Sequence, residues 1–387
     1  MKIALDASFL GATGGIGTYT FELIRCFAQL YSDNEFLLIS NKLPASIPQY
    51  ARQQETYQSR MPQLPPKWKQ IQTYKRFRQQ WWLLTLPKIL REYNPAVFHA
   101  LDSVSIPPFK KTPSLILTLH DIIPITNPEF CRYRDAIAAQ LLIRHAIKKA
   151  DKIISVSDYT TEQILARFPH VQSRLTTIYE GIDHNRFTPA PNRQELAQKL
   201  SHRYELFSPH FLLCVTTLNP RRNLVRLIRS FSEYINSFND SDACLVIAGC
   251  RGWKDNEVFQ TITQLNLETR VHFLQDVSDN DIVQLNQSAL AAINVSLLEG
   301  FGFPVLEAMA CGTPVICSST TSLGEISGDA ALRIDPTNQA SIVEAIYKII
   351  QNRGIRENFS KQGLERSKDF TWENAAKSTF KVYEEFI

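Results

Sequence analysis

Two glutamates, Glu299 and Glu307, are the residues whose type and spacing most clearly indicate chemistry. The stretch between them holds two glycines, which let a backbone come close to a ligand, and Pro304, which is favoured in the first turn of a helix. An apolar run at 292–296 precedes the stretch, and an apolar helical pattern at 305–310 follows it. We therefore expect Glu299 in a strand-to-helix loop and Glu307 about one turn inside the helix.

This layout predicts a site for a compound that carries both phosphates and hydroxyl groups. Main-chain N–H groups at the start of a helix lie at the positive end of its dipole and can hold a diphosphate. Carboxylates repel phosphate but accept hydrogen bonds from sugar or ribose hydroxyls. A nucleoside diphosphate sugar satisfies both requirements. The alternative interpretation is that the stretch is a surface loop and a helix with two unrelated glutamates and no ligand site. The expected contacts to the donor in this stretch are Gly300, Phe301, Gly302, Phe303, Leu306 and Glu307.

Two adjacent arginines, Arg221 and Arg222, follow a predicted strand at 211–217. Their guanidinium groups can bind a diphosphate and offset the charge that builds on the leaving nucleotide. The alternative is a solvated arginine pair near a helix start. Two Asp-x-Asp sequences could suggest a metal site. We assign the one at 240–242 to a polar loop, and the one at 279–281 to a helix N-terminus that aspartate caps. No Cys/His cluster has the spacing of a zinc site. We therefore expect no metal ion and no cofactor.

The first residues of the chain also suggest a ligand loop. A predicted strand at 2–7 is followed by a glycine-rich segment, 11–17, and by an amphipathic helix from 18 to about 30. A dinucleotide site is rejected, because the second strand ends at Ser40 without an acid for a ribose and no Tyr-x-x-x-Lys pair occurs. The glycines would instead let a sugar donor or acceptor approach the helix. The residues expected at this approach are Gly15, Ile16 and Gly17.

The composition indicates a globular protein, and the length is enough for two domains of ordinary size. The chain has 387 residues, of which 44% are hydrophobic and 21% charged, with a formal net charge of +4. That charge is too small to indicate nucleic acid as a partner. The seven cysteines form no regular framework, which fits a reducing compartment. The N-terminus does not resemble a signal peptide and no apolar run reaches the length of a spanning helix, so we expect a cytoplasmic protein.

One segment is strongly basic. Between Arg52 and Arg91 there are nine basic residues and one acidic residue, with aromatic residues interleaved. Residues 67–90 could form an amphipathic basic helix that contacts an anionic membrane at the inner face, or they could bind a phosphate-bearing acceptor. In the alternative interpretation the helix packs on its own domain, with Trp81 and Trp82 in the core.

Strands and helices alternate through the rest of the chain, which predicts parallel sheets. We expect an α/β protein with two Rossmann-like domains, at 1–187 and 206–370, a linker at 188–205, and a last helix at 371–387. The ligand crevice of such a sheet lies beyond the carboxyl ends of its strands. His120 stands at such an end, after a predicted strand at 114–119. A lone histidine is more commonly structural, so position alone does not assign it a function.

The stretch 299–307 closely resembles the Glu-x7-Glu signature of the retaining glycosyltransferases of family 4, and the similarity continues through 308–318. His120-Asp-Ile-Ile-Pro124 and Asn219-Pro-Arg-Arg-Asn223 also resemble family patterns. Arg222 stands where the family usually has lysine, and Gln275 where it usually has glycine. The resemblance implies the GT-B fold, in which the two domains face a central cleft and the last helix crosses back to the first domain.

The resemblance also implies roles. Glu307 would bind the ribose and the main chain near Val277 the base, while Glu299 and the amides of 301–303 would hold the sugar and the β-phosphate. His120 would face the donor sugar. The implied reaction moves a hexose, with retention, to a hydroxyl of a glycan or lipid-linked acceptor in surface polysaccharide synthesis. UDP-glucose is the favoured donor and GDP-mannose the second. A UDP-sugar epimerase of the same architecture and a non-catalytic nucleotide-sugar-binding protein are the alternatives.

Overall fold

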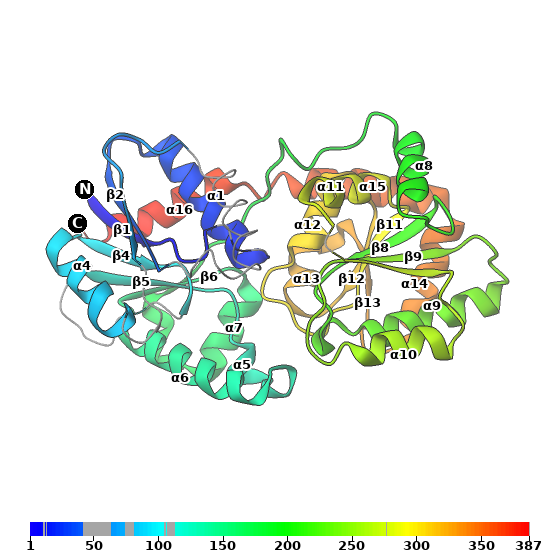
Figure 1. Ribbon diagram of the computed structural model, residues 1–387, viewed down its shortest axis with the longest axis horizontal. Helices are drawn as coiled ribbons and strands as arrows, with labels where there is room; N and C mark the ends of the chain where they lie inside the picture. Colours follow the sequence, from blue (N-terminus) through cyan, green and yellow to red (C-terminus); the bar gives the residue numbers. More distant parts are fainter. Residues whose placement is uncertain are drawn as a thin grey trace. The chain divides into compact units, whose positions relative to one another are not determined.

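The computed structural model describes residues 1–10, 12, 14–41, 63–73, 81–103, 106, 113–275 and 277–386. Two compact units divide the chain (Figure 1). Unit 1 comprises Met1–Gly181 and Trp372–Ile387, and unit 2 comprises Ile182–Thr371. Each unit has its own parallel sheet and its own core.

Unit 1 is built on a sheet with the strand order β3-β2-β1-β4-β5-β6-β7. Every pairing is parallel, and the central strands are apolar and buried on both faces, as parallel sheets require. The strands are β1 (Lys2–Asp6), β2 (Glu35–Asn41), β3 (Lys69–Thr73), β4 (Val97–Ala100), β5 (Ser114–Leu119), β6 (Lys152–Ser155) and β7 (Leu175–Thr177).

Helices cover both faces of this sheet (Figure 1). On one face α1 packs with α16, the last helix of the chain, and Tyr31 and Phe380 stack there with ring centroids 3.6 Å apart. On the other face α4, α6 and α7 contribute to one apolar cluster. The α-helices are α1 (Gly15–Leu30), α4 (Leu86–Tyr93), α5 (Ile123–Thr126), α6 (Tyr133–Lys149), α7 (Asp158–Arg167) and α16 (Trp372–Glu384). Short elements of other helical types are η1 (Trp81–Thr85), η3 (Pro128–Phe130) and η4 (Pro169–Arg174).

Unit 2 repeats the plan with the strand order β10-β9-β8-β11-β12-β13. Its strands are β8 (Phe211–Val215), β9 (Cys244–Ala248), β10 (Val271–Leu274), β11 (Ala291–Asn294), β12 (Val315–Ser318) and β13 (Leu332–Ile334). Its helices are α8 (Arg193–Arg203), η5 (Pro220–Arg222), α9 (Leu224–Phe238), α10 (Asn256–Gln264), α11 (Asp279–Ser288), α12 (Phe303–Ala310), α13 (Thr321–Ser327), η6 (Gly328–Ala330), α14 (Gln339–Gln351) and α15 (Arg353–Ser367).

Both sheets reverse their strand order once, between β1 and β4 in unit 1 and between β8 and β11 in unit 2. At such a reversal the connections leave the two neighbouring strands in opposite directions, which opens a crevice at the carboxyl edge. Two of the predicted site segments start there in unit 2, because η5 follows β8 and the loop with Glu299 follows β11.

Several expected boundaries differ from the structure. Residues 67–90 are not one helix, because Lys69–Thr73 form the edge strand β3, whose backbone pairs with β2. The part of this segment at 74–80 lies outside the described residues. Trp81 is buried in the core of unit 1, as in the alternative interpretation, and the Trp82 indole donates to the carbonyl of Ile106.

The segment expected to be a linker, 188–205, instead contains α8 and belongs to unit 2. Leu200 of this helix is fully buried against the sheet, so packing rather than composition decides its conformation. Helix α1 begins at Gly15, three residues earlier than expected. Within the described ranges, no helix combines the length and the apolar composition needed to cross a bilayer.

Candidate functional site

The carboxyl ends of β8 and β11 bring the predicted cationic and acidic residues of unit 2 together. The two strands are neighbours, with Leu212 paired to Ala291 and Leu213 to Ala292. The loops that follow them are joined by their backbones, because the N–H of Leu297 donates to the carbonyl of Arg221 at 2.8 Å.

Asn223 fixes the turn that carries the two arginines. Its φ of 60° ends η5 in the left-handed region, which asparagine tolerates better than most residues. Its side-chain amide donates to the carbonyls of Val295 at 3.2 Å and Pro336 at 2.7 Å. The turn is therefore tied to the ends of two other strands, and the position of Arg221 and Arg222 is set by the sheet edge.

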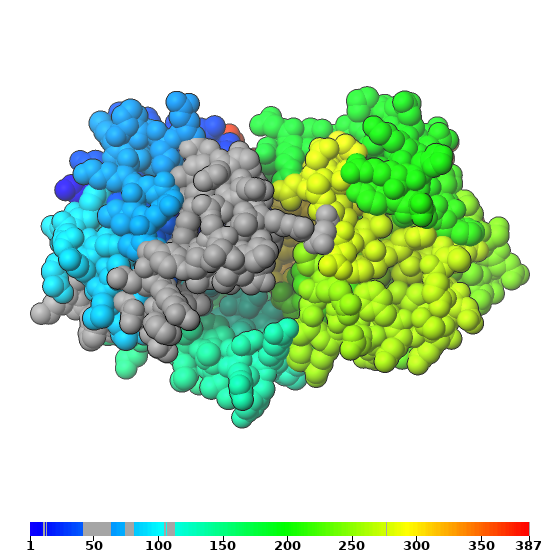
Figure 2. All heavy atoms as spheres, in the orientation of Figure 1, coloured from blue at the N-terminus to red at the C-terminus, as the bar shows by residue number. Residues whose placement is uncertain are grey.

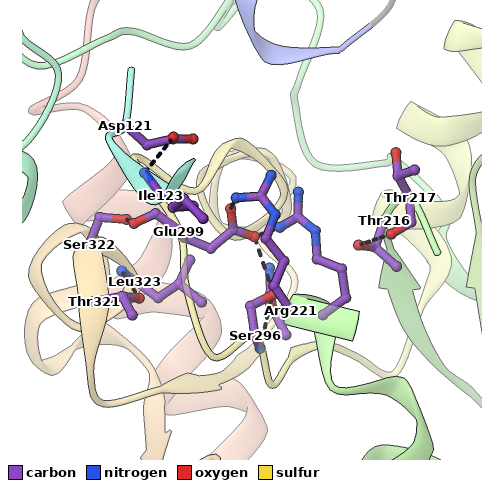
Figure 3. A network of polar contacts seen from close by, with 12 residues as sticks. Asp121, Ile123, Thr216, Thr217, Arg221, Ser296, Glu299, Thr321, Ser322 and Leu323 are labelled. Atoms are coloured by element: carbon purple, nitrogen blue, oxygen red, sulfur yellow. Dashed lines mark hydrogen bonds and ion pairs between the residues drawn. The ribbon is translucent and has the colours of Figure 1, made fainter. Parts of the chain in front are cut away.

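The carboxylate of Glu299 faces these two arginines (Figure 3), and the residue is only 7% exposed. Its Oε1 atom forms an ion pair with Arg222 and accepts the Ser296 hydroxyl at 3.2 Å. Its Oε2 atom lies 4.0 Å from Nη1 of Arg221. The Ser322 hydroxyl donates to the Glu299 carbonyl at 3.0 Å and fixes the backbone. The carboxylate thus offsets the positive charge of the two adjacent guanidinium groups.

Helix α12 begins next to this cluster. It starts at Phe303, two residues before the expected start, and Gly302 precedes it with a φ of 118°. A Cβ atom at Gly302 would lie 2.6 Å from Cδ2 of Leu323, so this position needs glycine for two reasons. The ring of Phe301 is buried and packs edge-on against Phe303, with centroids 5.2 Å apart. The first turn of α12 is therefore held rigidly beside Glu299, with Gly300 next to it in the chain.

Glu307 lies within α12, in a different surrounding from Glu299. Burial raises the pKa of its carboxyl to about 7, with the positive charge of Arg186 opposing that rise and Asp279 adding to it. Arg186 is itself engaged, because it donates to the main-chain carbonyl of Asp279 at 2.7 Å. Hydrogen-bond donors from a ligand would lower this pKa and favour the ionised form. Leu306 is fully buried, so contact with a ligand would come from its main chain.

Unit 1 places His120 at the end of β5, with both ring nitrogens in use. Nε2 lies 3.0 Å from the carbonyl of Leu101, which can only accept, so Nε2 carries a proton. Nδ1 lies 3.0 Å from Oε1 of Glu180, whose side chain is 1% exposed. One further proton is shared in this second contact. Burial alone would lower the pKa of His120, but the hydrogen bond and charge of Glu180 outweigh it and raise the pKa.

Sequence reasoning missed Glu180 as a functional residue. It follows β7, sixty residues beyond His120, and only the sheet order β5-β6-β7 brings the two together. The one signal in the sequence was a glutamate shortly after the β-branched residues of the segment that forms β7. Behind the pair runs a buried chain of hydroxyls and a second imidazole, from Tyr19 through Thr118 and His99 to Tyr383.

The glycine segment lies at the start of α1, also in unit 1. Gly15 and Ile16 begin the helix at its exposed end, whereas Gly17 is buried. A Cβ atom at Gly17 would lie 1.9 Å from the carbonyl oxygen of Ala12, so this glycine allows the preceding loop to fold onto the helix. Gly11 and Thr13 lie outside the described residues. The predicted residues therefore fall into two groups, one in each unit.

The remaining predicted features have structural partners. Val277 is half-buried after β10 and packs on the cluster that includes α8 and α11. Asp279 does not cap α11, because the hydroxyl of Ser278 accepts from the N–H of Asp281 instead. Asp281 pairs with Arg203 at 2.7 Å, and Asp240 accepts from the Tyr234 hydroxyl at 2.5 Å. Across the described part of the chain, no group of three or more His, Cys, Asp or Glu side chains is placed to hold a metal ion.

Two family models match the chain, one in each half. Residues 13–186 match "Glycosyltransferase Family 4", and residues 201–366 match "Glycosyl transferases group 1". Together they cover every strand of the two sheets except β1, and they leave out the last helix.

Two relatives and one solved structure match between 61% and 100% of this chain. O-antigen chain mannosyltransferase B of Escherichia coli is 27% identical over 376 residues, which is 95% of this chain and 95% of that protein. O-antigen chain mannosyltransferase RfbU of Salmonella typhimurium is 28% identical over 236 residues, 61% of this chain and 60% of that protein. The crystal structure of HepE from Anabaena in complex with UDP and glucose matches with a TM-score of 0.78 and 18% identity, covering 100% of both chains. This chain and HepE share a fold.

Proposed function

Because this chain is a family 4-like glycosyltransferase with the GT-B fold, we propose that it transfers a mannosyl residue from a nucleoside diphosphate sugar to a hydroxyl of a glycan or lipid-linked acceptor. The observation that carries this proposal is the cluster of Arg221, Arg222 and Glu299 at the strand reversal of unit 2, beside the first turn of α12.

The ion pairs among Arg221, Arg222 and Glu299 can be exchanged for contacts with a bound donor. Arg222 and Glu299 form a largely buried ion pair without a ligand, and such a pair persists only while each charge has a partner. A diphosphate would take over Arg221 and Arg222 with stronger, bidentate contacts. Glu299 would then be released to accept hydrogen bonds from the sugar. Donor binding and exposure of the sugar-binding carboxylate would thus be one event.

The same geometry supports a proposal for the contacts of the rest of the donor. The amides of Phe301, Gly302 and Phe303 stand at the start of α12, where the helix dipole favours the β-phosphate. Glu307, farther along the helix, would accept from the two ribose hydroxyls, and main-chain groups near Val277 would meet the base. In unit 1, His120 and the start of α1 at Gly15–Gly17 would face the sugar and the acceptor.

Retention of configuration would follow from attack on the face that the diphosphate leaves. The departing phosphate would take the proton of the acceptor hydroxyl, and the two guanidinium groups would stabilise the charge it gains. Glu299 serves as a hydrogen-bond acceptor in this scheme rather than as a nucleophile, consistent with its position between two cations. The reaction then needs no cofactor, and the arginines supply the positive charge that a divalent ion provides elsewhere.

Two observations bear on the donor sugar. The relative that spans 95% of this chain is named a mannosyltransferase, which favours mannose and, with it, GDP-mannose. The complex of HepE contains UDP and glucose, but its 18% identity supports only the fold. UDP-glucose, the donor favoured by the sequence resemblance, is therefore the second candidate.

Calorimetry with GDP, UDP and ADP, followed by hydrolysis assays with the corresponding sugar donors, tests the proposal. We expect tight binding of GDP and slow hydrolysis of GDP-mannose, both lost in Arg221→Ala/Arg222→Ala. Tight UDP binding with hydrolysis of UDP-glucose would transfer the proposal to the second donor. Conversion of UDP-GlcNAc without an acceptor would identify an epimerase, and binding without hydrolysis or transfer would identify a non-catalytic binding protein.

A further inference from the structure

The outward face of helix α6 is more apolar than the solvent-exposed face of an ordinary surface helix. Its inward side packs into the core of unit 1. On the opposite side, Tyr133, Ile137 and Leu141 are 80%, 45% and 65% exposed. Residues four apart in a helix lie one above the other, so these three side chains form a continuous apolar row. Helix α6 lies at the lower edge of unit 1 in Figure 1, and the corresponding teal atoms form that edge in Figure 2.

The row continues into basic residues on the same side of the helix. Arg144 and Lys148 follow Leu141 at helical spacing, and Arg134 flanks the first turn. All three are exposed, and within the described residues the structure records no ion pair for any of them. Asp135 is the one acidic residue of α6, and helical spacing places it away from the row.

A neighbouring element extends the apolar surface. The Trp82 ring of η1 packs edge-on against His145 of α6, with centroids 5.5 Å apart. The next two residues of η1, Leu83 and Leu84, are 39% and 70% exposed. Isolated exposed apolar residues are common, but several on two adjoining elements, bordered by exposed cations, mark a contact surface.

We propose that this surface, the α6 face (Tyr133, Ile137, Leu141, Arg144 and Lys148), docks unit 1 on an anionic lipid bilayer. Apolar tips would enter the headgroup region, while the cations would lie against lipid phosphates. Charge favours this occupant over a second copy, because a two-fold contact would bring the cations of both copies into one interface and the row has no acidic residue to pair with them. The five residues of the α6 face lie outside the basic segment 67–90, although Leu83 and Leu84 of that segment adjoin them. The proposal does not depend on the identity of the donor sugar.

Co-sedimentation of the full-length protein with vesicles tests the proposal. Vesicles of phosphatidylcholine with about 30% phosphatidylglycerol should bind the protein, neutral phosphatidylcholine vesicles should bind it far less, and salt should weaken the binding. Arg144→Gln/Lys148→Gln and Tyr133→Ser/Ile137→Ser/Leu141→Ser should each lower the vesicle partition coefficient about tenfold or more. Both variants should keep wild-type thermal unfolding and donor hydrolysis, because the α6 face lies outside the catalytic site.

A matched control removes the same charge from unit 2. Arg229→Gln/Lys361→Gln exchanges two exposed basic residues there and should bind vesicles as the wild type does. A direct readout compares Tyr133→Trp with Tyr347→Trp, where only the first should be quenched by brominated lipids. Equal binding to neutral and anionic vesicles, or unchanged binding of both α6 variants, would overturn the proposal. So would concentration-dependent dimerisation that the apolar triple variant abolishes.

Discussion

At the scale of single residues, the carboxylates of Glu299 and Glu307 have different properties because their surroundings differ. Glu299 is held ionised by two guanidinium groups. Glu307 has its pKa raised to about 7 by burial, against the opposing charge of Arg186. The first carboxylate offsets the positive charge of the two arginines, whereas ionisation of the second costs folding free energy unless hydrogen-bond donors reach it.

The raised pKa of Glu307 predicts a pH-dependent gain in stability for Glu307→Gln. A carboxyl whose folded pKa lies above its unfolded value loses stability as the pH rises from about 4.5 through 7. The neutral amide avoids this loss, so we expect a gain of about 1–2 kcal/mol in the unfolding free energy at pH 8 and little change at pH 5. Nucleotide binding should weaken at least about tenfold, because the amide accepts only one of two ribose hydrogen bonds well.

Thermal unfolding at the two pH values measures this effect. Glu344→Gln is the control, because Glu344 is an exposed partner of Lys348 on α14. A gain of equal size for Glu307→Gln at pH 5 and pH 8 would show that the raised pKa is not its cause.

The contact between His120 and Glu180 predicts a shift in the pH profile of transfer. With Glu180 ionised, His120 stays protonated at both nitrogens to a higher pH. Glu180→Gln keeps the shape but removes the charge, so the loss of kcat at high pH should begin about one unit lower. Asp158→Asn, at an exposed carboxylate that accepts from Tyr179, should leave the profile unchanged. An unshifted profile in Glu180→Gln would confine Glu180 to a structural role.

At the scale of elements, the start of α12 depends on one glycine. Gly302→Ala would place a Cβ atom against Leu323 in a backbone conformation that L-residues avoid, at a cost of about 2–3 kcal/mol. Gly312→Ala lies just beyond the other end of the same helix. Its Cβ atom would be strained by the left-handed backbone and would lie 3.3 Å from Cδ1 of Leu364, so we expect a loss of about 1 kcal/mol in the unfolding free energy. Denaturant unfolding measures both, and donor KM should rise only for Gly302→Ala. Equal effects of the two variants would argue against a rigid phosphate-binding turn.

The parallel strands and the two-sheet architecture could be predicted from the sequence, because buried parallel strands are short apolar runs bounded by turn residues. Strand β3 could not, since Lys69–Thr73 is polar and its structure comes from pairing with β2 at the edge of the sheet. The proximity of Arg222 to Glu299 could also be inferred, because their loops follow strands β8 and β11 and these strands are neighbours in the expected sheet order. The partnership of His120 with Glu180 required the order of three strands, which no local pattern encodes.

At the scale of the whole molecule, the last helix makes the core of unit 1 depend on both ends of the chain. Phe380 stacks on Tyr31, the residue that follows α1, and the Tyr383 hydroxyl lies 2.7 Å from Nδ1 of His99. A chain shortened near its C-terminus would therefore lose packing in the N-terminal sheet.

Phe380→Ala should consequently destabilise unit 1 by about 3 kcal/mol and leave unit 2 unaffected. Hydrogen exchange by mass spectrometry separates the two units: amides of β1 and β4 should exchange faster, and those of β8 and β11 should not. Tyr347→Ala, at a partly exposed ring of unit 2, should change the unfolding free energy by no more than about 1 kcal/mol. Faster exchange in both sheets after Phe380→Ala would mean that the units unfold together.

The most direct measurement is a crystal structure of the protein with its nucleoside diphosphate sugar bound. We predict that the diphosphate lies within hydrogen-bonding distance of Arg221, Arg222 and the amides at the start of α12. Glu299 should have left Arg222 for hydroxyls of the sugar, and Glu307 should contact the ribose. A nucleotide bound elsewhere, or an Arg222–Glu299 pair that stays intact beside a bound donor, would contradict the proposed exchange of partners.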